Sequence, residues 1–597
     1  MTKTLSSFED IVFWDFEFIS KPGERPDVVC LAWHCVSTGQ THRLWRDQLT
    51  DQPPFRIDDT VLCVCFVGNA ELCCHLALGW PLPANVLDLS AEFRCITNGR
   101  TVPAGKGLLG ALAYYGFDSI DSKRKDAMRD RIIKGWPFSE KERNDILLYC
   151  ASDVDAMVRL LPKMLPDIEL DIALHRGEFV AVSARMEHRG VPIDMEIFPP
   201  LTDKHAWRYV RDAMVPVIDA QYGVYVKGPD GDWHFSMEKF EAYLERERIV
   251  GWPRLETGKL NMKRKTFEDM SKGHPELENL RQLRHARDKM RKIKLAVGAD
   301  GRNRTVLWPF KAKTSRTQPK AAQWIFSPAV WLRSLIKPGP GRALAYFDFS
   351  AMEFGMAACL SGDPVMLDFY RSGDPYLSFC KRVGKAPATA TKKTPGMGAL
   401  RDRYKTGLVA IQYGVQAETL AARLGISTFE AQEMLAQHHE LFAVYWRWAA
   451  DWLAHTLDTG VLWTPMGWFC RTGITEFNER SIINLPVQGA GADILRIACI
   501  WATRHGLELC APVHDAILIE APIERIDADV ALLQEIMRRA SRLVLTPSGG
   551  PAFELRTDAK IIHYPDRYTD SRGDEIWARV LTLLVEYQAS SLQQEAV

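Results

Sequence analysis

The sequence has no excess of charge of either sign. Its 597 residues carry 75 Lys and Arg against 75 Asp and Glu, so the formal net charge is zero. This balance excludes a protein that coats nucleic acid through overall positive charge, and it equally excludes an acidic disordered chain. Binding of nucleic acid through local basic patches remains open, because such a footprint needs only part of the surface.

Long hydrophobic runs are also missing. No stretch of about 18 apolar residues could cross a membrane, and the N-terminus MTKTLSSFEDIVFWDFEF lacks the basic and then apolar segments of a signal peptide. We therefore expect a cytoplasmic protein with no membrane partner. At roughly 150 residues a domain, the length predicts about three to four domains.

Cysteine is too sparse for a disulfide scaffold, with 13 residues in the whole chain. The densest group consists of Cys63, Cys65, Cys73, Cys74 and His75. Its spacing matches no common zinc pattern, and VLCVCFV is typical of a buried strand. We favour small core residues here over a metal site, which remains the alternative.

The chain contains neither repeats nor low-complexity tracts, and its pattern changes along its length. Residues 1–165 alternate short apolar strands (IVFWDFEFIS, VLCVCFVG) with helical stretches (LLGALAYYGF, NDILLYCASDVDAMVRLLPKML), which predicts an α/β domain. Residues 166–305 read as mostly polar helices, with a loop at KGPDGDWH and a basic helix at RQLRHARDKMRKIK. Beyond them, Pro and Gly punctuate strands separated by long helices.

Two carboxylates stand out by their context. Asp348 ends the apolar strand ALAYFDFS, and Asp515 in PVHDAIL lies at or near the turn of a β-hairpin. A buried strand seldom ends in Asp unless the charge is paired or binds metal. Brought together, the two could hold two Mg²⁺ ions for phosphoryl transfer, although each alone could be a helix cap or turn residue.

A third element adds cations to these acids. ALRDRYKTGLVAIQYGV places Arg401, Lys405, Val409 and Tyr413 at four-residue steps, so that they form one gently turning stripe on a helix. The cations suit a triphosphate, and the tyrosine offers a flat surface to a base pair. An ordinary amphipathic helix is the alternative.

These segments resemble, in order and spacing, motifs A, B and C of the family A DNA polymerases, the DNA polymerase I type. The matching residues are FDFSAMEFGMAACLSGD, R401-x3-K405-x7-Y413-G414 and VHDA; ERSIINLPVQGAGADI, KTSRTQP and MEHRGVPID match further family segments. The resemblance spans about residues 180 to 565.

The resemblance implies a role for each matching residue. Asp348 and Asp515 would bind two Mg²⁺ ions, with Mn²⁺ as an alternative. Arg401 and Lys405 would hold the dNTP phosphates, and Lys405 would also assist the leaving group. The remaining roles are stacking on the nascent base pair for Tyr413, a steric gate against ribose for Glu353, and contact with the primer–template for Arg316, Arg480, Asn484, Gln488 and His514. The basic run from Arg281 to Lys294 would contact duplex phosphates.

Two positions depart from the family pattern. Ala516 stands where motif C usually has Glu, so an auxiliary carboxylate is missing at that position. Val409 stands where Phe or Tyr is common, so we do not carry over a role in sensing the sugar.

The N-terminal domain carries a second set of acids. In VFWDFEFIS, Asp15 and Glu17 share one face of a strand, and in YCASDVDA, Tyr149 and Asp153 lie one helical turn apart. This pair of motifs resembles the DEDD type of proofreading 3′–5′ exonuclease, with an RNase H-like fold. The resemblance implies two Mg²⁺ ions at Asp15, Glu17 and Asp153, and a water oriented by Tyr149.

The middle acid of that exonuclease pattern is not clear. The family has Asn followed four residues later by Asp, whereas here Asn69 leads to Cys73. Glu71 is our first candidate for the missing metal ligand and Asp88 the second. We favour an active exonuclease over a weakened one, because the other ligands and the tyrosine are present.

We therefore expect a multidomain α/β and α+β protein: an RNase H-like exonuclease followed by a right-hand polymerase with an antiparallel palm sheet. The expected parts are 1–165 (exonuclease), 166–305 (connector and helical thumb), 306–360 (palm, motif A), 361–475 (fingers, motif B) and 476–597 (palm continuation, motif C and C-terminal segment).

The expected function is template-directed DNA synthesis with proofreading. Its partners would be primer–template DNA and dNTPs, with a processivity factor or other replication proteins as further candidates. The length, with no room for a 5′ nuclease domain, suggests a bacteriophage replicative polymerase acting in the host cytoplasm. The alternatives are a single-subunit RNA polymerase, an exonuclease whose polymerase half only binds DNA, and a non-catalytic DNA-binding module. Preference for normal or modified bases stays open.

Overall fold

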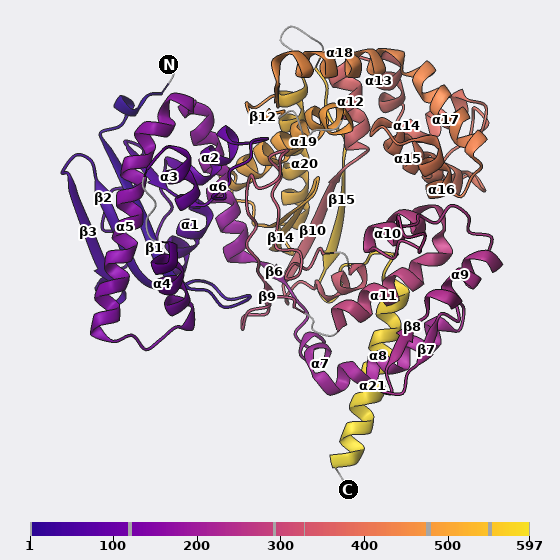
Figure 1. Ribbon diagram of the computed structural model, residues 1–597, viewed down its shortest axis with the longest axis horizontal. Coiled ribbons are helices and arrows are strands. Elements are labelled where there is room, and N and C mark those ends of the chain that lie inside the picture. The colour runs from indigo at the N-terminus through magenta and orange to yellow at the C-terminus, as the bar shows by residue number, and fades with distance from the viewer. Residues whose placement is uncertain are drawn as a thin grey trace.

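The structure is a computed structural model that describes residues 3–117, 122–290, 294–327, 329–472, 479–546 and 552–595. The side chains of residues 122–124, 285–290 and 591–595 lie outside this description. In Figure 1 the N-terminal sheet and its helices lie on the left, and the rest of the chain forms a larger body on the right. Over the described ranges, we find no helix with the length and apolar character needed to cross a bilayer.

The N-terminal part is built on a five-stranded sheet in the order β3-β2-β1-β4-β5. The first three strands pair antiparallel, whereas β4 and β5 continue the sheet in parallel. All of β4 is buried, as expected for a parallel strand covered on both faces. The elements are β1 (Asp10–Ile19), β2 (Asp27–Cys35), β3 (Gln40–Trp45), β4 (Val61–Cys65), β5 (Val86–Asp88), α1 (Gly68–Ala77), α2 (Leu89–Ile96), α3 (Leu108–Tyr114), α4 (Ser122–Lys134) and α5 (Glu140–Met164).

The predicted strands and helices of this part are confirmed. IVFWDFEFIS overlaps β1 to within one residue, VLCVCFVG contains β4, and LLGALAYYGF contains α3. NDILLYCASDVDAMVRLLPKML lies within α5 apart from its last residue, and α5 begins four residues earlier than predicted, at Glu140. Helix α5 begins at a capping box, in which Ser139 and Glu142 bind each other's backbone amides. It packs against β1 and β2, so its inner face lies over the strand that carries the first acidic motif.

Helix α6 (Leu170–Arg189) joins the two halves of the molecule. It packs against α1 and β5 on the N-terminal side and against α19 and β13 on the other. The chain then forms a helical lobe, which we call the thumb, at the lower right of Figure 1. Its elements are α7 (Phe198–Thr202), α8 (Lys204–Asp219), β7 (Tyr225–Lys227), β8 (Trp233–Phe235), α9 (Met237–Arg246), α10 (Arg264–Gly273) and α11 (Glu278–Met290). The short strands β6 (Val191–Pro192) and β9 (Arg302–Asn303) precede and follow it in the chain and pair with each other near the centre of Figure 1.

The expectation of a plain loop at KGPDGDWH was wrong in part. The segment is the turn of a hairpin between β7 and β8, closed by a 2.8 Å hydrogen bond from the Gly228 amide to the Asp232 carbonyl. Gly231 has a φ of 77° within the turn. Aromatic residues flanking a Pro-Asp-Gly turn favour strands on both sides, and this signal is easily missed when the strands are short.

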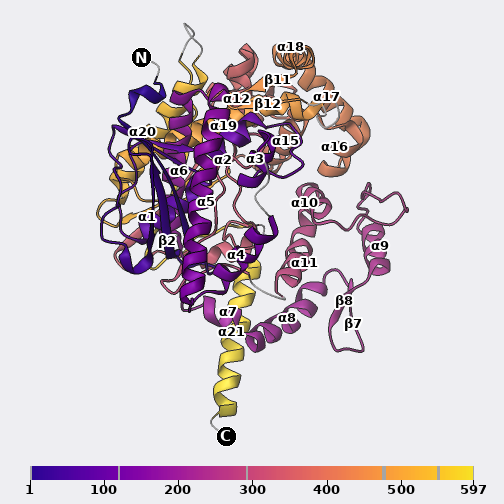
Figure 2. The same cartoon turned by 60° about the vertical axis from the view of Figure 1, so that its left-hand side comes forward.

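The second sheet has four antiparallel strands in the order β13-β14-β10-β15, and we call it the palm sheet. The predicted antiparallel palm sheet corresponds to it. Its strands are β10 (Arg342–Phe349), β13 (Leu509–Val513), β14 (Ala516–Pro522) and β15 (Thr557–His563), and the helices α12 (Met352–Ser361), α19 (Glu479–Arg504), α20 (Ile526–Leu545) and α21 (Asp574–Glu595) accompany it. Helix α21 runs along α8 of the thumb, and its end projects from the body (Figures 1 and 2).

A group of helices beyond the palm sheet forms what we call the fingers. They are α13 (Pro364–Arg371), α14 (Pro375–Arg382), α15 (Met397–Gln412), α16 (Ala417–Leu424), α17 (Thr428–Leu441) and α18 (Ala443–Thr459), followed by the hairpin β11 (Val461–Trp463) and β12 (Phe469–Arg471). Figure 2 places α15, α16 and α17 above the thumb helices α10 and α11. Helix α10 packs against α16, so the thumb and the fingers touch.

Candidate active sites

Two carboxylates come together at one end of the palm sheet. Asp348 pairs across the sheet with Ala516, the first residue of β14. Asp515 directly precedes Ala516, in a two-residue turn where His514 has a φ of 58°. A non-glycine residue in this conformation is uncommon and typical of functional sites. The predicted positions, a strand end for Asp348 and a hairpin turn for Asp515, are confirmed.

The proximity of these acids changes their electrostatics. Burial and the negative charge of Asp515 raise the pKa of Asp348 to about 7, and Asp558 adds to the effect, while Lys405 opposes it. Carboxylates that repel one another in this way are suitable donors for divalent cations, which relieve the repulsion and prefer oxygen ligands. The residues present therefore fit a magnesium site.

Both aspartates line a cavity of about 730 Å³, and Arg401, Lys405 and Val409 of the predicted stripe on α15 line it too. Its wall includes Asp348, Glu353, Tyr376, Arg401, Lys405, Val409, Asp515, Arg538, Arg556 and Asp558. A cationic helix face thus stands opposite paired carboxylates. This arrangement suits a polyphosphate, because the cations bind its oxygens while the acids hold its metal ions.

Arg401 is held at the cavity wall by a partner. Its Nε donates to Asp374 Oδ2 at 2.9 Å, and its guanidinium lies over the Tyr376 ring, 5.1 Å from the centroid. One turn further along α15, Lys405 is close enough to Asp348 to oppose the rise of that carboxyl's pKa. The helix therefore delivers two cations to the same space.

Residues from four separate motifs meet around Tyr413, which caps the end of α15. Burial and the neighbouring Glu353 carboxylate raise the pKa of Tyr413, and Arg316 and Gln488 act in the opposite direction. Burial likewise raises the pKa of Glu353, in the first turn of α12. The structure thus brings Tyr413 close to three side chains that lie far from it in the sequence: Arg316, Glu353 and Gln488.

A second cavity, of about 870 Å³, lies between the thumb and the palm and includes Arg316 and His514. Cations from both sides line it: Arg264, Lys272, Arg281, Arg316, Arg333, Arg496 and Arg572. Such a channel suits a phosphate backbone. Arg281 of the predicted basic run lies here, paired with Glu278 at 2.6 Å; the side chains of residues 285–293 in that run lie outside the described residues.

The remaining predicted DNA contacts follow α19. Arg480, Asn484 and Gln488 lie at four-residue steps along this helix, with Arg480 exposed and the other two half-buried. Gly414 lies directly beneath Arg480, because a Cβ at that glycine would be 3.1 Å from Arg480 Cγ. The stripe on α19 therefore continues the surface at the end of α15.

A separate acidic cluster occupies the N-terminal sheet. Asp15, Glu17 and Asp153 bring one carboxylate oxygen each to within 4.8 Å of the others, and this is the only such group of potential metal ligands among the described residues. Asp15 Oδ2 is buried and has no hydrogen-bond partner in the described chain. Burial raises the pKa of both Asp15 and Glu17, and the negative charges of neighbouring acids raise it further. A cluster of this kind fits a divalent cation.

Lys125 of α4 reaches into this cluster. It forms an ion pair with Asp153, and both side chains are largely buried, with 11% and 13% of their surface exposed. Its ammonium also lies 5.6 Å from the centroid of the Tyr149 ring, so the tyrosine predicted from the motif stands beside the cluster.

The middle acid of the pattern is not part of the cluster. Glu71 is buried in α1, and its Oε2 accepts a 2.7 Å hydrogen bond from the Phe16 amide of β1. Burial, and then the nearby charges of Asp15 and Asp153, raise the pKa of Glu71. Its carboxylate holds the strand between Asp15 and Glu17, and its role as a metal ligand stays a prediction. Asp88 instead caps α2, accepting from the Ser90 amide at 2.9 Å.

Asn69 and the cysteines also have structural partners. Asn69 donates to Glu187 at 2.6 Å, and the Cys73 thiol faces the Ala184 carbonyl at 3.7 Å. Glu187 and Ala184 both belong to α6, so Asn69 and Cys73 help to hold α1 against α6. Consistent with core residues, the cysteines around β4 and α1 are buried and form no metal-ligand group in the described part of the chain.

Sequence reasoning missed two charged residues of these sites, Asp558 and Lys125. Asp558 lies on β15, and the alternation of polar and apolar residues in LRTDAKII only weakly predicts a strand there. The local sequence does not reveal that β15 pairs with β10. Lys125 belongs to the basic segment SKRK, which the sequence alone does not distinguish from a solvated helix face.

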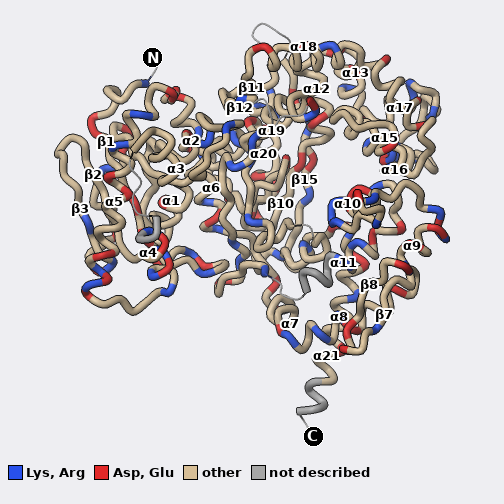
Figure 3. The backbone as a smooth tube through the Cα atoms, viewed as in Figure 1, with Lys and Arg blue, Asp and Glu red and all other residues tan. Residues whose placement is uncertain are grey.

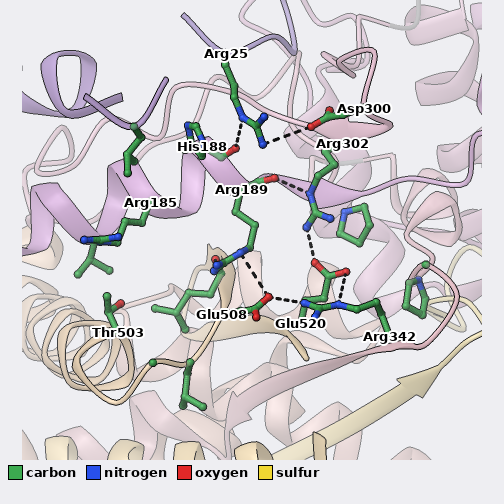
Figure 4. A pocket seen from close by; sticks show the side chains of 18 of the residues that line it. Arg25, Arg185, His188, Arg189, Asp300, Arg302, Arg342, Thr503, Glu508 and Glu520 are labelled. Carbon is green, nitrogen blue, oxygen red and sulfur yellow. Dashed lines mark hydrogen bonds and ion pairs between the residues drawn. The ribbon is translucent and has the colours of Figure 1, made fainter. Parts of the chain in front are cut away.

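A third cavity, of about 1380 Å³, lies elsewhere, and its lining includes none of these metal-site acids. Figure 4 shows two of its cations bound within the protein: Arg302 contacts Glu520 and the Arg189 carbonyl, each at 2.6 Å, and Arg342 pairs with Glu508. Because much of its lining comes from α6 and from the palm-sheet strands and the segments that flank them, we interpret this cavity as the junction between α6 and the palm sheet.

Comparison with known proteins agrees with this geometry. Residues 316–553 match the model of DNA polymerase family A. DNA polymerase I of Aquifex aeolicus is 26% identical over 443 residues, covering 67% of this chain and 73% of that protein. The DNA polymerase of Mycobacterium phage D29 is 22% identical over 411 residues, covering 66% of this chain and 64% of that protein.

A solved structure shares the fold. The polymerase domain of Pol1 from M. smegmatis, in complex with DNA primer-template and dNTP, superposes with a TM-score of 0.68 at 20% identity. The match covers 92% of this chain and 94% of that one. The matched segment includes both palm aspartates, the α15 stripe and the α19 stripe. The part of the chain that matches the model of DNA polymerase family A, residues 316–553, is thus the part that carries these candidate site residues.

Proposed function

We propose that this chain is a DNA-directed DNA polymerase with a 3′–5′ exonuclease site for proofreading. The observation that carries the proposal is the 730 Å³ cavity in which Asp348 and Asp515 face Arg401 and Lys405. Such a cavity has the two parts that nucleotidyl transfer needs, a site for divalent cations and a site for a triphosphate.

In this proposal, Asp348 and Asp515 would hold Mg²⁺ ions, with Mn²⁺ as the alternative, and the bound ions would supply positive charge to neutralise the charge that develops on the phosphates. Arg401 and Lys405 bind the triphosphate of the dNTP, and Arg401 exchanges its contact with Asp374 for a phosphate oxygen. The primer 3′-hydroxyl gives its proton to solvent, and its oxygen forms a bond to the α-phosphorus as the bond from that phosphorus to the α,β-bridging oxygen breaks. Pyrophosphate leaves beside Lys405, whose ammonium stabilises its charge.

Selection of the sugar is proposed to rest on Glu353. Its side chain stands in the cavity wall beside Tyr413, where the resemblance implies a gate against the ribose 2′-OH. A single-subunit RNA polymerase, the main alternative, would have to admit that hydroxyl. The presence of both palm aspartates also argues against a polymerase half that only binds DNA.

We propose exonuclease chemistry at Asp15, Glu17 and Asp153. The cluster of three acids within 4.8 Å and the adjacent Tyr149 support the proposal, as does the mixed sheet in which β1, β4 and β5 run parallel. Tyr149 orients the attacking water, and Glu71 supports the metal ligands indirectly by holding the Phe16 amide. In this proposal, the three carboxylates of the cluster bind the metal ions, and no fourth carboxylate ligand is needed.

The proposed partners are primer–template DNA and dNTPs. The thumb–palm channel supplies cations for the duplex, and the M. smegmatis relative was solved with primer-template and dNTP. With a net charge of zero, duplex binding depends on this local patch, so a processivity factor is a further proposed partner. The similarity to the phage D29 polymerase supports a phage source as a proposal.

A primer-extension assay tests the proposal. Wild-type protein with Mg²⁺ should lengthen the primer with dNTPs but not with rNTPs, and should shorten it when no nucleotide is present. Asp348→Ala should lose extension and keep shortening, whereas Asp15→Ala should do the reverse. Extension that persists in Asp348→Ala would refute the polymerase assignment.

A further inference from the structure

Asp558 of β15 is a carboxylate of the palm cavity that the motifs do not include. Strand β10 lies between β14 and β15, and Asp348 is paired with Ala516 on one side and with Asp558 on the other. Directly opposed residues of antiparallel strands point to the same face, with Cβ atoms about 4.5–5.5 Å apart. The side chains of Asp348 and Asp558 are therefore neighbours on the face that lines the cavity.

The two residues that pair with Asp348 across the sheet differ in charge. On the β14 side, Ala516 is fully buried and carries no polar group. On the β15 side, Asp558 is exposed to the cavity, where it adds to the rise in the pKa of Asp348. The acid that the motif lacks after Asp515 thus has a counterpart on the opposite neighbouring strand.

The Asp558 carboxylate is held in place while one oxygen stays available. Oδ2 accepts a 2.5 Å hydrogen bond from Ser350 Oγ, and the Ser350 amide donates to the Arg556 carbonyl at 2.8 Å. Oδ1 makes no hydrogen bond to any residue that the structure describes. Ser350 directly follows the end of β10, so this contact ties β15 to the strand that carries Asp348.

A third acid beside two others is electrostatically costly unless it has a cationic partner. In the described residues, Asp558 forms no ion pair, although Lys405 and Arg556 line the same cavity. The Asp348, Asp515 and Asp558 oxygens do not all fall within 4.8 Å of one another. This spacing favours contact with a metal ion through bound water over direct coordination.

We propose that Asp558 is the third acidic residue of the polymerase site, and that it helps to hold the divalent cations by accepting hydrogen bonds from their bound waters. The inference rests on the proposed polymerase function. Asp558 acts as a positioning residue, since partners of this kind orient metal ligands and their loss typically costs about 10- to 100-fold in metal affinity or activity.

The test compares Asp558→Asn and Asp558→Glu in an Asp15→Ala background, which removes a ligand of the other metal cluster. Asp566→Asn is the matched control, because Asp566 is also exposed, follows the same strand and does not line the cavity. Binding of Mn²⁺ to the protein with a dideoxy-terminated primer–template and dNTP is followed by electron paramagnetic resonance. Single-nucleotide incorporation is titrated with Mg²⁺.

We expect Asp558→Asn to weaken Mn²⁺ binding and raise the half-saturating Mg²⁺ about 10-fold or more, with incorporation recovering at high Mg²⁺. Asp558→Glu and Asp566→Asn should stay within about twofold of the parent, because each keeps the cavity acid. If the Mg²⁺ and Mn²⁺ titrations of Asp558→Asn match those of the parent, the inference is overturned. It is also overturned if Asp558→Asn binds Mn²⁺ as tightly as the parent but incorporates no nucleotide at any Mg²⁺ concentration. Persistent incorporation by Asp348→Ala would instead refute the polymerase function itself.

Discussion

Lys125 of α4 forms a buried ion pair with Asp153 of α5, inside the cluster that Asp15 and Glu17 complete. The lysine thus supplies a positive charge where three carboxylates converge. Its charge opposes the rise in the pKa of Asp153 that burial causes.

Replacing Lys125 with Met should destabilise the metal-free protein. Loss of one partner from a buried pair costs about 3–5 kcal/mol, because the other charge stays buried. Thermal unfolding in EDTA should therefore begin at a lower temperature, and Mg²⁺ should restore part of the loss by replacing the missing charge. Lys134→Met, at an exposed position of the same helix, is the control. Equal unfolding of the two variants in EDTA would contradict this account of the pair.

The acid pair of the palm predicts a pH-dependent stability. The folded-state pKa of Asp348 is about 7, above its usual value of 3.8. The folded protein then binds more protons than the unfolded chain between these values, so the contribution of Asp348 to stability falls as the pH rises through that window. Asp348→Asn should raise the melting temperature in EDTA more at pH 8 than at pH 5.

That comparison uses Asp566→Asn to account for a general change in surface charge. Saturating Mg²⁺ should remove the advantage of Asp348→Asn, because the wild-type carboxylate then has its cation. A stabilisation that is independent of both pH and Mg²⁺ would show that repulsion between the palm acids is not its cause.

The stripe on α15 predicts a selective effect on nucleotide binding. Arg401→Ala and Lys405→Ala should each lower kcat/KM for dNTP by about 10- to 100-fold, since a hydrogen bond to a charged group is worth about 1.5–3 kcal/mol. Arg403→Ala removes a cation from the same helix at an exposed position outside the cavity and should change little. Similar losses in all three variants would point to nonspecific electrostatics.

The position of Glu353 predicts a change in sugar selection. Glu353→Ala should raise the efficiency of rNTP incorporation relative to dNTP by roughly 10- to 200-fold, the range that a small steric difference in a pocket gives. Glu353→Gln keeps the bulk and should keep most of the selectivity. The ratio of kcat/KM values for the two sugars measures both variants, and an unchanged ratio in Glu353→Ala would assign selection to another residue.

The palm acids and the α15 stripe could be predicted because their signals are local. Asp348 ends an apolar strand, Asp515 sits in a short turn, and Arg401 and Lys405 recur at a helical period. Asp558 could not be found in this way. It reaches the site through strand pairing, and 208 residues separate it from its partner Ser350.

The candidate exonuclease site likewise combines residues that local sequence patterns predict with residues that only the tertiary packing reveals. Asp15 and Glu17 follow from strand alternation, whereas the role of Glu71 depends on which way a buried helix turns its side chain. Lys125 lies in a basic segment whose sequence resembles a solvated helix face, and only the packing of α4 on β1 and α5 reveals its buried position.

The most direct test of the central claim is single-turnover incorporation of one dNTP by Asp348→Asn in the Asp15→Ala background. The substitution keeps the shape of the side chain while it removes a metal-binding charge from the 730 Å³ cavity. The account predicts that incorporation falls by several orders of magnitude while primer–template affinity stays close to that of the parent. Incorporation at the parent's rate would contradict it, because the palm aspartates would then not form the polymerase site.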